Sequence, residues 1–487
     1  MNRGMLLVLA LELSNHLRSI DDQRVGVALP PGAAGVLTNL AIFLTGKTPV
    51  NLNFTTGAGA ASRSIEKARI TTMVSADAVV RKFPDFPWTR EVFDVGDWIK
   101  ETSSKKLFLI SKFCLLACRN GEKVLEKLPL SMQGPNSEAT LLFTSGSSGN
   151  PKGVSLSHLN LLSNCDQIAS AGLFKKKDKV LSNLPLFHSF GFTVATLYPL
   201  LHDLAMVCSP SPLDCKSTLR AIENEKVEIV LGTPTFLKGY LRKAHERQLQ
   251  SIRYVIAGAE RTPAGFKDKW ELACGCKYLE GYGLTEASPG ISFNLPGSGS
   301  KEGSVGLLLP QIELKTIDPE SGVDLPRGSR GVLCFRGPNV FSGYLDEPEA
   351  NKKTIDPQGW LVTGDLGRLD EDGFLFLSGR LARFSKIGGE MVPHERIEEL
   401  IAEVLDSNDD VPQCAIVGVE DENKGEKLIL LTTQALNPVS LRKALLQKGV
   451  SNLWIPKEII DIEEVPRLAS GKLDIRKLKE IAQHTLE

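Results

Sequence analysis

The chain has 487 residues, of which 42% are apolar and 24% are charged, and its formal net charge at pH 7 is −1. This is the composition of a soluble globular chain, and the lack of excess positive charge argues against nucleic acid as a partner. Nine cysteines are scattered without a disulfide framework, so we expect reduced thiols and a cytoplasmic location.

Strand-like and helical segments alternate through the first half of the chain, which predicts α/β layers. Apolar runs predict strands at residues 24–29, 139–143, 227–231 and 253–257, and apolar periodicity predicts helices at 35–44 and 217–225. The run at residues 5–13 is short and contains Glu12, so we expect a core-facing helix there. No segment is long enough to span a bilayer, so any membrane contact would be peripheral, at the inner face of the cell membrane.

The pattern changes after residue 303. Residues 303–379 combine short strands with many turn signals and predict a β-rich subdomain. Residues 395–405 and 440–448 then predict helices, and residues 415–419 predict a strand. We therefore predict a large multi-layer α/β domain over residues 1–380 and a small α+β domain over residues 381–487.

A loop rich in glycine and hydroxyl side chains follows the predicted strand at 139–143. Glycines let backbone N–H groups surround an anion, hydroxyls add donors, and Lys152 adds a positive charge. The spacing is not that of a Walker loop, because Gly146 is followed at the critical offset by Pro-Lys-Gly. A solvated turn is the alternative for this segment alone. The candidate phosphate-binding residues are Thr144, Ser145, Gly146, Ser147, Ser148, Gly149 and Lys152.

A second candidate segment is Gly-Tyr-Gly-Leu-Thr-Glu at residues 281–286. The ring of Tyr282 is suited to stack on adenine, and the hydroxyl of Thr285 is suited to bind the α-phosphate. Glu286 is suited to hold Mg²⁺, which prefers oxygen ligands. On its own the segment fits a glycine-bounded turn with a surface carboxylate equally well.

A third segment places Asp365 in a glycine-rich turn, with Arg380 following a second Gly-containing stretch. A carboxylate in such a turn can accept hydrogen bonds from both hydroxyls of a ribose. Without further context, a turn Asp and a surface Arg are the alternative.

A fourth segment places Lys472 directly after a Ser-Gly turn near the C-terminus. The turn lets the lysine project from a loop, and the segment's resemblance to a known Pro-x-x-x-Ser-Gly-Lys motif implies that this cation bridges a carboxylate and an α-phosphate and lowers the barrier to their reaction. A surface lysine is the alternative.

These four motifs, in this order between residues 142 and 473, resemble those of the adenylate-forming superfamily of acyl-CoA synthetases, luciferases and peptide-synthetase adenylation domains. The resemblance implies ATP and Mg²⁺ as cofactors and a mobile C-terminal domain. It also implies that His188 lies near the acyl carboxylate. It further assigns Lys472, Glu286, Thr285 and His188 to catalysis, and it assigns Tyr282, Asp365, Arg380 and the segment Gly258, Ala259, Glu260 to the nucleotide.

Residues 27–35, 49–53, 255–260 and 385–392 are most similar to the acyl-ACP synthetase half of bacterial bifunctional acyltransferase/acyl-ACP synthetase proteins. This resemblance implies that a fatty acid is activated as its adenylate and then transferred to the phosphopantetheine thiol of holo acyl carrier protein. Gly388 and Gly389 would leave room for the thiol arm. Coenzyme A as the acceptor is the nearest alternative.

The sequence departs from the family pattern at two places. The hinge usually has Asp or Lys two residues after the arginine, whereas this chain has Ala382, with Arg383 as a candidate substitute. Family members also have a longer stretch before the first predicted helix, so we expect a short or truncated N-terminus. Both departures support a third hypothesis, a catalytically inactive acyl- or nucleotide-binding protein. His16 and Asp21 fit the His-x4-Asp pattern of acyltransferases, which we attribute to chance.

Overall fold

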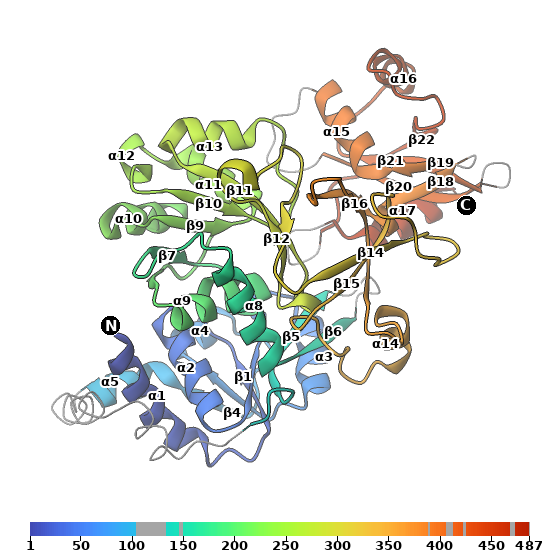
Figure 1. Ribbon diagram of the computed structural model, residues 1–487. Helices are drawn as coiled ribbons and strands as arrows, with labels where there is room; N and C mark the ends of the chain where they lie inside the picture. Colours follow the sequence, from blue (N-terminus) through green and yellow to red (C-terminus); the bar gives the residue numbers. More distant parts are fainter. Residues whose placement is uncertain are drawn as a thin grey trace.

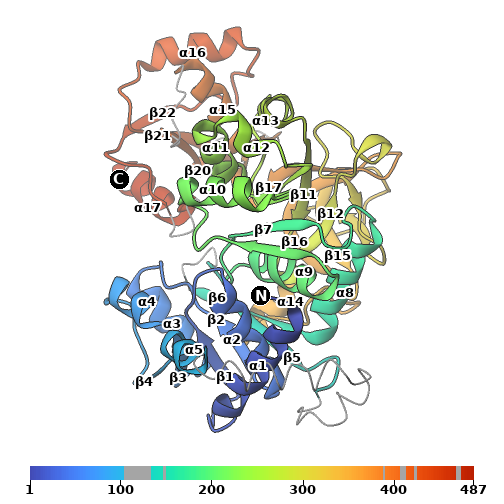
Figure 2. The same cartoon turned by 90° about the vertical axis from the view of Figure 1, so that its left-hand side faces the viewer.

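The computed structural model describes residues 1–103, 133–145, 150–387, 390–405, 413–421, 425–467 and 473–486. In these ranges, β-sheets and helices form stacked layers, with the N-terminal elements at one end and the C-terminal elements at the other (Figures 1 and 2). The fold class is the predicted α/β class. The helices and strands that the sequence predicts are all present, with ends shifted by at most a few residues.

The N-terminal layer contains a parallel sheet in the order β2-β1-β3-β4. Its elements are α1 (Arg3–Leu17), β1 (Arg24–Val27), α2 (Ala33–Leu44), β2 (Thr48–Asn51), α3 (Ala58–Ala68), β3 (Thr72–Ser75), α4 (Asp77–Lys82), β4 (Glu91–Asp94) and α5 (Val95–Ser103). The apolar run at residues 5–13 lies in α1, which buries Leu6, Leu13 and Leu17 against α2 and β1. In the described ranges, no helix combines the length and the hydropathy needed to cross a membrane.

A central seven-stranded sheet has the order β13-β12-β11-β10-β9-β7-β8. Its strands are β7 (Lys179–Ser182), β8 (Ala205–Cys208), β9 (Ile229–Gly232), β10 (Tyr254–Ala257), β11 (Lys277–Gly283), β12 (Gly290–Phe293) and β13 (Leu307–Leu308). The surrounding helices are α8 (His158–Ser170), the π-helix η1 (Phe190–Leu197), α9 (Tyr198–Leu201), α10 (Cys215–Glu225), α11 (Pro234–Lys243), α12 (Glu246–Leu249) and α13 (Phe266–Cys274). Strand β9 is a continuous apolar run because it is buried on both faces.

A two-stranded hairpin and a third sheet complete the surroundings of the centre. The hairpin pairs β5 (Glu138–Ser145) with β6 (Pro151–Ser157). The antiparallel sheet has the order β14-β15-β16-β17 and contains β14 (Glu313–Ile317), β15 (Gly331–Arg336), β16 (Leu361–Leu369) and β17 (Leu375–Arg380), with α14 (Pro348–Thr354) between β15 and β16. This sheet lies in the range for which the sequence predicts a β-rich subdomain.

The C-terminal sheet has the order β19-β18-β21-β20, with β22 beside β21. Its elements are β18 (Phe384–Ile387), β19 (Glu390–Pro393), α15 (His394–Val404), β20 (Cys414–Asp421), β21 (Gly425–Thr432), α16 (Pro438–Gln447), β22 (Glu458–Asp461) and α17 (Ile475–Leu486). Ile397, Ile401 and Leu430 belong to a core of its own. The boundary between residues 380 and 381 stays a prediction.

Candidate active site

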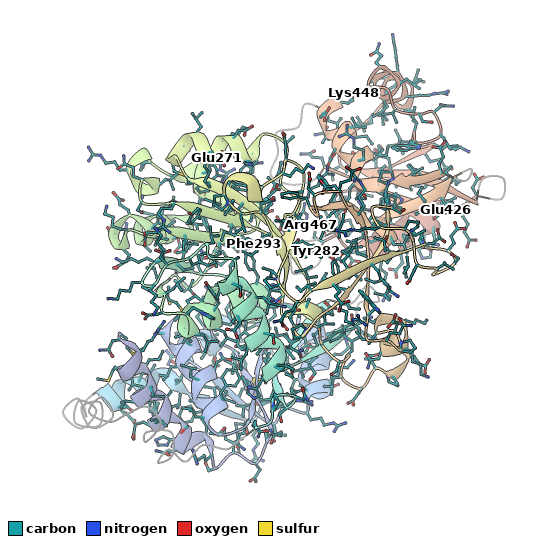
Figure 3. All side chains as sticks on the ribbon, in the orientation of Figure 1. Glu271, Tyr282, Phe293, Glu426, Lys448 and Arg467 are labelled. Atoms are coloured by element: carbon teal, nitrogen blue, oxygen red, sulfur yellow. The ribbon has the colours of Figure 1, made fainter. Side chains whose placement is uncertain are left out.

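A cleft of about 3910 Å³, the central cleft, lies at the carboxyl ends of β9, β10 and β11. Ligands of α/β sheets bind at this edge, because the loops that leave parallel strands meet there. Tyr282 and Arg467, both labelled in Figure 3, line the cleft from the central sheet and from the C-terminal part of the chain. Residues from distant parts of the sequence therefore face one common space.

The hairpin β5–β6 brings the start and the end of the predicted phosphate loop together. Thr144 and Lys152 are cross-strand neighbours, and both line the central cleft. The Nζ atom of Lys152 lies 4.7 Å from the ring centroid of Tyr344. The predicted residues Gly146, Ser147, Ser148 and Gly149 lie outside the described residues, as does the side chain of Ser145.

The turn after β11 carries Thr285 and Glu286 in a short 3-10 helix. The backbone is tight here, because a Cβ atom at Gly283 would lie 2.3 Å from the carbonyl oxygen of Pro289. Ser189 donates a hydrogen bond to the hydroxyl of Thr285 at 3.3 Å, and the hydroxyl of Tyr344 donates to Oε1 of Glu286 at 2.7 Å. Both predicted side chains thus line the cleft with neighbours that fix them.

Asp365 and Arg380 are cross-strand neighbours in β16 and β17. Arg380 Nε donates to Oδ1 of Asp365 at 3.0 Å, and the hydroxyl of Tyr282 donates to Oδ2 at 2.5 Å. Burial and the adjacent Asp365 carboxylate raise the pKa of Tyr282 well above its usual range. The sequence predicts separate roles for these three residues, whereas the structure joins them in one hydrogen-bonded group.

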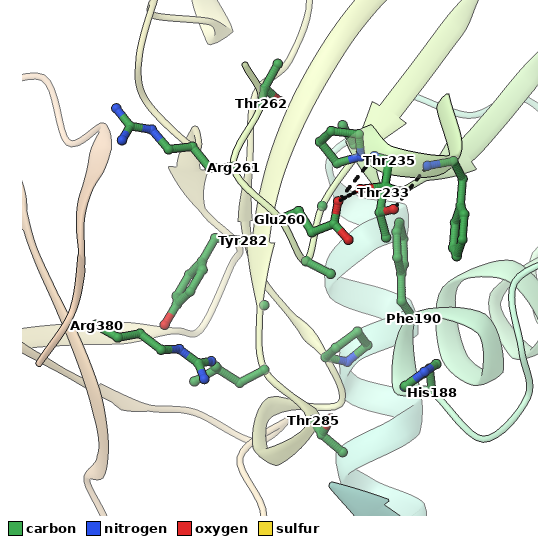
Figure 4. A pocket seen from close by; sticks show the side chains of 18 of the residues that line it. His188, Phe190, Thr233, Thr235, Glu260, Arg261, Thr262, Tyr282, Thr285 and Arg380 are labelled. Atoms are coloured by element: carbon green, nitrogen blue, oxygen red, sulfur yellow. Dashed lines mark hydrogen bonds between the residues drawn. The ribbon is translucent and has the colours of Figure 1, made fainter. Parts of the chain in front are cut away.

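The segment that follows β10 also lines the cleft, and Figure 4 shows its Glu260 beside Thr235. Ala259 has a positive φ of 68°. A Cβ added at Gly258 would lie 3.4 Å from the carbonyl oxygen of Gly281. Glu260 accepts hydrogen bonds from the backbone N–H of Thr235 at 3.2 Å and from its hydroxyl at 2.6 Å. The carboxylate thereby joins this segment to the start of α11.

His188 lies on the loop before the π-helix η1, and its ring is 4.8 Å from that of Phe187. Apolar side chains that belong to one hydrophobic cluster line part of the cleft, and this part is called the apolar recess. They are Ile168, Phe174, Leu184, Phe190, Val194, Phe236, Ile256 and Leu309. Figure 4 shows His188 and Phe190 across the cleft from Tyr282 and Arg380. The cleft therefore has one apolar side and one side of charged and hydroxyl groups.

The predicted hinge residue Ala382 lies in a short 3-10 helix between β17 and β18. The side chain of its neighbour Arg383 is not exposed at the surface. The guanidinium is buried, donates to Glu398 at 2.5 Å and donates to the carbonyl oxygen of Ile416 at 2.9 Å. Arg383 therefore fastens the 3-10 helix that precedes β18 to α15 and β20. The predicted residues Lys472, Gly388 and Gly389 lie outside the described residues.

Residues 6–345 match the family model described as "AMP-binding enzyme". The chain belongs to the AMP-binding enzyme family. It is 31% identical to a long-chain-fatty-acid–CoA ligase of Bacillus subtilis over 75% of this chain and 65% of that protein. It is also 31% identical to 4-coumarate–CoA ligase 2 of Solanum tuberosum over 70% of this chain and 64% of that protein. The matched region thus spans slightly less than two thirds of these curated relatives.

Solved structures of related fold cover nearly the whole chain. ATP-bound MatB from Rhodopseudomonas palustris superposes with a TM-score of 0.80 at 25% identity, covering 99% of this chain and 93% of that one. The Bacillus subtilis O-succinylbenzoate coenzyme A synthetase in complex with ATP and a magnesium ion gives a TM-score of 0.77 at 23% identity, covering 97% and 92%. The fold of this AMP-binding family member is therefore shared with proteins whose structures were solved with bound ATP.

The residues of this family member fit a nucleotide and a magnesium ion. Glu286 uses Oε1 for the bond from Tyr344, and Mg²⁺ is usually held by one or two carboxylates together with substrate phosphates. Among the described residues there is no group of three or more His, Cys, Asp or Glu side chains arranged for a metal ion. A single carboxylate, Glu286, close to the hairpin that carries Lys152 agrees with that mode of binding.

Two side chains of the site were not found from the sequence. Ser189 supports Thr285, and Tyr344 contacts both Glu286 and Lys152. The only sequence signal for Tyr344 is a Ser-Gly-Tyr turn ahead of α14, which resembles many other turns. Its role depends on a neighbour 58 positions away, which no local pattern indicates.

Proposed function

We propose that this protein is an AMP-forming acid–thiol ligase that activates a fatty acid with ATP and Mg²⁺ and transfers it to coenzyme A. The observation that carries the proposal is the pairing of two surfaces in one cleft. Lys152, Glu286 and Asp365 supply charged groups suited to a nucleotide, and the recess beside His188 supplies an apolar wall. The names of the matched relatives, which include a long-chain-fatty-acid–CoA ligase, support the same activity.

The proposed first step joins the carboxylate of the acid to the α-phosphate of ATP and releases pyrophosphate. Two anions approach each other in this step, so positive charge that bridges them lowers the barrier. Lys152 is suited to the outer phosphates, and Lys472 is assigned to the reacting groups. Bound Mg²⁺ would neutralise phosphate charge, with Glu286 as its protein ligand. Asp365 and Arg380 would hold the ribose side of the nucleotide.

In the proposed second step, the thiol sulfur attacks the acyl carbon of the adenylate, and AMP leaves with the electron pair of the broken C–O bond. The thiol proton passes to solvent or to a nearby base. His188 lies on the loop beside the apolar recess, where the acyl carbon is expected. A long acyl chain suits this recess because aromatic and aliphatic side chains line it.

Holo acyl carrier protein is the second candidate acceptor. Helix α17 supports it, because Arg476, Lys477 and Lys479 line the cleft from this helix, and Arg467 lines it as well. Asp474 and Glu480 are the acidic residues of this stretch that line the cleft, and Glu480 pairs with Arg476 at 2.7 Å. A cationic rim of this kind would attract an acidic carrier protein. The names of the matched relatives favour coenzyme A, which we therefore place first.

The test is AMP formation from ATP and palmitate, with coenzyme A or holo carrier protein as the sole acceptor. We expect AMP formation to need palmitate and to be fastest with coenzyme A. Lys472→Ala should abolish it, and Lys443→Ala, on the exposed face of α16, should not. Turnover with carrier protein alone would reassign the acceptor. ATP binding without any palmitate-dependent AMP would establish the inactive binding protein instead.

A further inference from the structure

The segment at residues 337–345 connects the phosphate hairpin to the turn that carries the carboxylate. The backbone N–H of Leu345 donates to the carbonyl oxygen of Gly153 at 2.8 Å, next to Lys152 in β6. The backbone N–H of Phe341 donates to the carbonyl oxygen of Glu286 at 2.9 Å. One short segment is thereby attached to both charged parts of the site.

The side chain of Tyr344 makes the same connection. Its hydroxyl donates to Oε1 of Glu286 at 2.7 Å, and its ring lies 4.7 Å from Nζ of Lys152. A carboxylate accepting from a hydroxyl forms a charge-assisted hydrogen bond, and an ammonium over a tyrosine ring gains a cation–π interaction.

The position of Tyr344 is itself held from two sides. Asn351 of α14 accepts from the backbone N–H of Tyr344 at 2.6 Å and donates to its carbonyl oxygen at 2.9 Å. The ring packs edge-on against buried Phe341 with centroids 5.0 Å apart. A Cβ at Gly343 would lie 2.9 Å from the Asn351 side chain, so a glycine permits the close approach. The ring is therefore fixed before any ligand binds.

We propose that Tyr344 is a positioning residue that orients the Glu286 carboxylate for the metal ion and holds the Lys152 ammonium for the phosphates. The inference rests on the proposed function, because it assumes that a metal–nucleotide complex binds in the central cleft. Two parts of Tyr344 have separate tasks. The hydroxyl acts on the metal through Glu286, and the ring acts on the phosphates through Lys152.

If the hydroxyl and the ring of Tyr344 have separate tasks, removing each one should weaken a different binding affinity. Tyr344→Phe removes the hydroxyl and keeps the ring, so it should weaken binding of the metal–nucleotide complex while sparing the metal-free nucleotide. Loss of the group that orients a metal ligand typically lowers metal affinity about ten- to a hundredfold. Tyr344→Leu removes the ring as well, so metal-free nucleotide should also bind about three- to fivefold more weakly, as expected for one cation–π contact.

The experiment uses the full chain and α,β-methylene ATP, which cannot release pyrophosphate. Binding of the nucleotide alone is measured by calorimetry in the presence of EDTA, and binding of its Mn²⁺ complex is measured by calorimetry with the nucleotide saturated by Mn²⁺. Tyr254→Phe is the matched control, because Tyr254 lies at the start of β10 and its ring contacts Arg253. Thermal unfolding of each variant confirms that it is folded.

We expect Tyr344→Phe to bind the Mn²⁺ complex at least tenfold more weakly than the wild type and the metal-free nucleotide within twofold of it. If Tyr344→Phe weakened binding of the Mn²⁺ complex and of the metal-free nucleotide equally, or changed neither affinity, the inference would be overturned and the proposed function would stand. A wild-type protein that binds no metal–nucleotide complex would overturn the proposed function, and the inference would fall with it.

Discussion

Replacing Arg383 by methionine should open the C-terminal sheet, because the substitution leaves a carboxylate buried without its cation. The side chains of Arg383 and Glu398 are only 7% and 16% exposed, and their N–O distance is 2.5 Å. Arg383 also donates to the carbonyl oxygen of Ile416, whose N–H donates to the other oxygen of Glu398 at 2.6 Å. The substitution therefore breaks a closed hydrogen-bonded group that joins the 3-10 helix before β18 to α15 and β20.

Removing one member of a buried ion pair typically costs about 3–5 kcal/mol. The loss should depend on pH. Burial raises the pKa of Glu398, and Arg383 opposes this shift, so the pKa should rise further in the variant. A carboxyl group whose folded pKa exceeds its unfolded pKa favours the folded state below the unfolded value. That contribution is lost as pH rises through the folded value, so the variant should be less stable at pH 8 than at pH 5.

The assay is hydrogen exchange of peptides that cover β20, which reports local opening of the C-terminal sheet. A loss of about 3–5 kcal/mol corresponds to exchange about two to four orders of magnitude faster. Arg396→Met is the matched control on α15, because Arg396 is 51% exposed and pairs with Glu399. An exposed pair contributes about 0–1 kcal/mol, so this control should change exchange by less than tenfold.

The double variant Arg383→Met with Glu398→Gln gives the decisive comparison. If the cost comes from an unpaired buried charge, neutralising Glu398 should recover part of the stability at pH 8. Exchange in the double variant that is as fast as in Arg383→Met alone, or faster, would refute the reasoning. Equal losses at pH 5 and pH 8 would refute it as well.

Three further outcomes can be measured. Gly191→Ala should lower the free energy of unfolding in urea by about 1–3 kcal/mol and slow palmitate-dependent turnover, because the added Cβ would lie 2.2 Å from the carbonyl oxygen of Pro185. Gly57→Ala is the control, because the space around Gly57 is open, and it should change neither quantity. Equal effects of the two substitutions would contradict this. Burial lowers the pKa of His394 to about 3, so neutral His394 stabilises the folded state above its usual pKa, and this stabilisation is lost as pH falls. His394→Asn should therefore make the protection of β20 from hydrogen exchange fall less steeply with decreasing pH than in the wild type. The same dependence on pH in both proteins would contradict this. Asp365→Asn should weaken binding of a fluorescent ATP analogue about ten- to a hundredfold, because its two oxygens accept from a guanidinium and a phenol; unchanged affinity would remove it from the site.

The sequence by itself determined the features that depend on neighbouring residues. Apolar runs gave strands such as β9 and β10, because a strand buried on both faces needs continuous apolar side chains. Glycine at position 283 is a local requirement as well, since no side chain fits beside Pro289. The order of the motifs was sufficient to predict the family, which the match over residues 6–345 confirms.

The tertiary structure alone decided how the candidate side chains are paired. Arg383, a candidate for the hinge on sequence grounds, is buried against Glu398 instead. Tyr282 and Asp365, assigned to different parts of a nucleotide, share a hydrogen bond across 83 positions. Tyr344 meets Glu286 because one segment attaches to both the hairpin and the turn. Such pairings depend on the sheet order and on how the loops cross, and those properties are set by packing of the whole chain rather than by any local pattern.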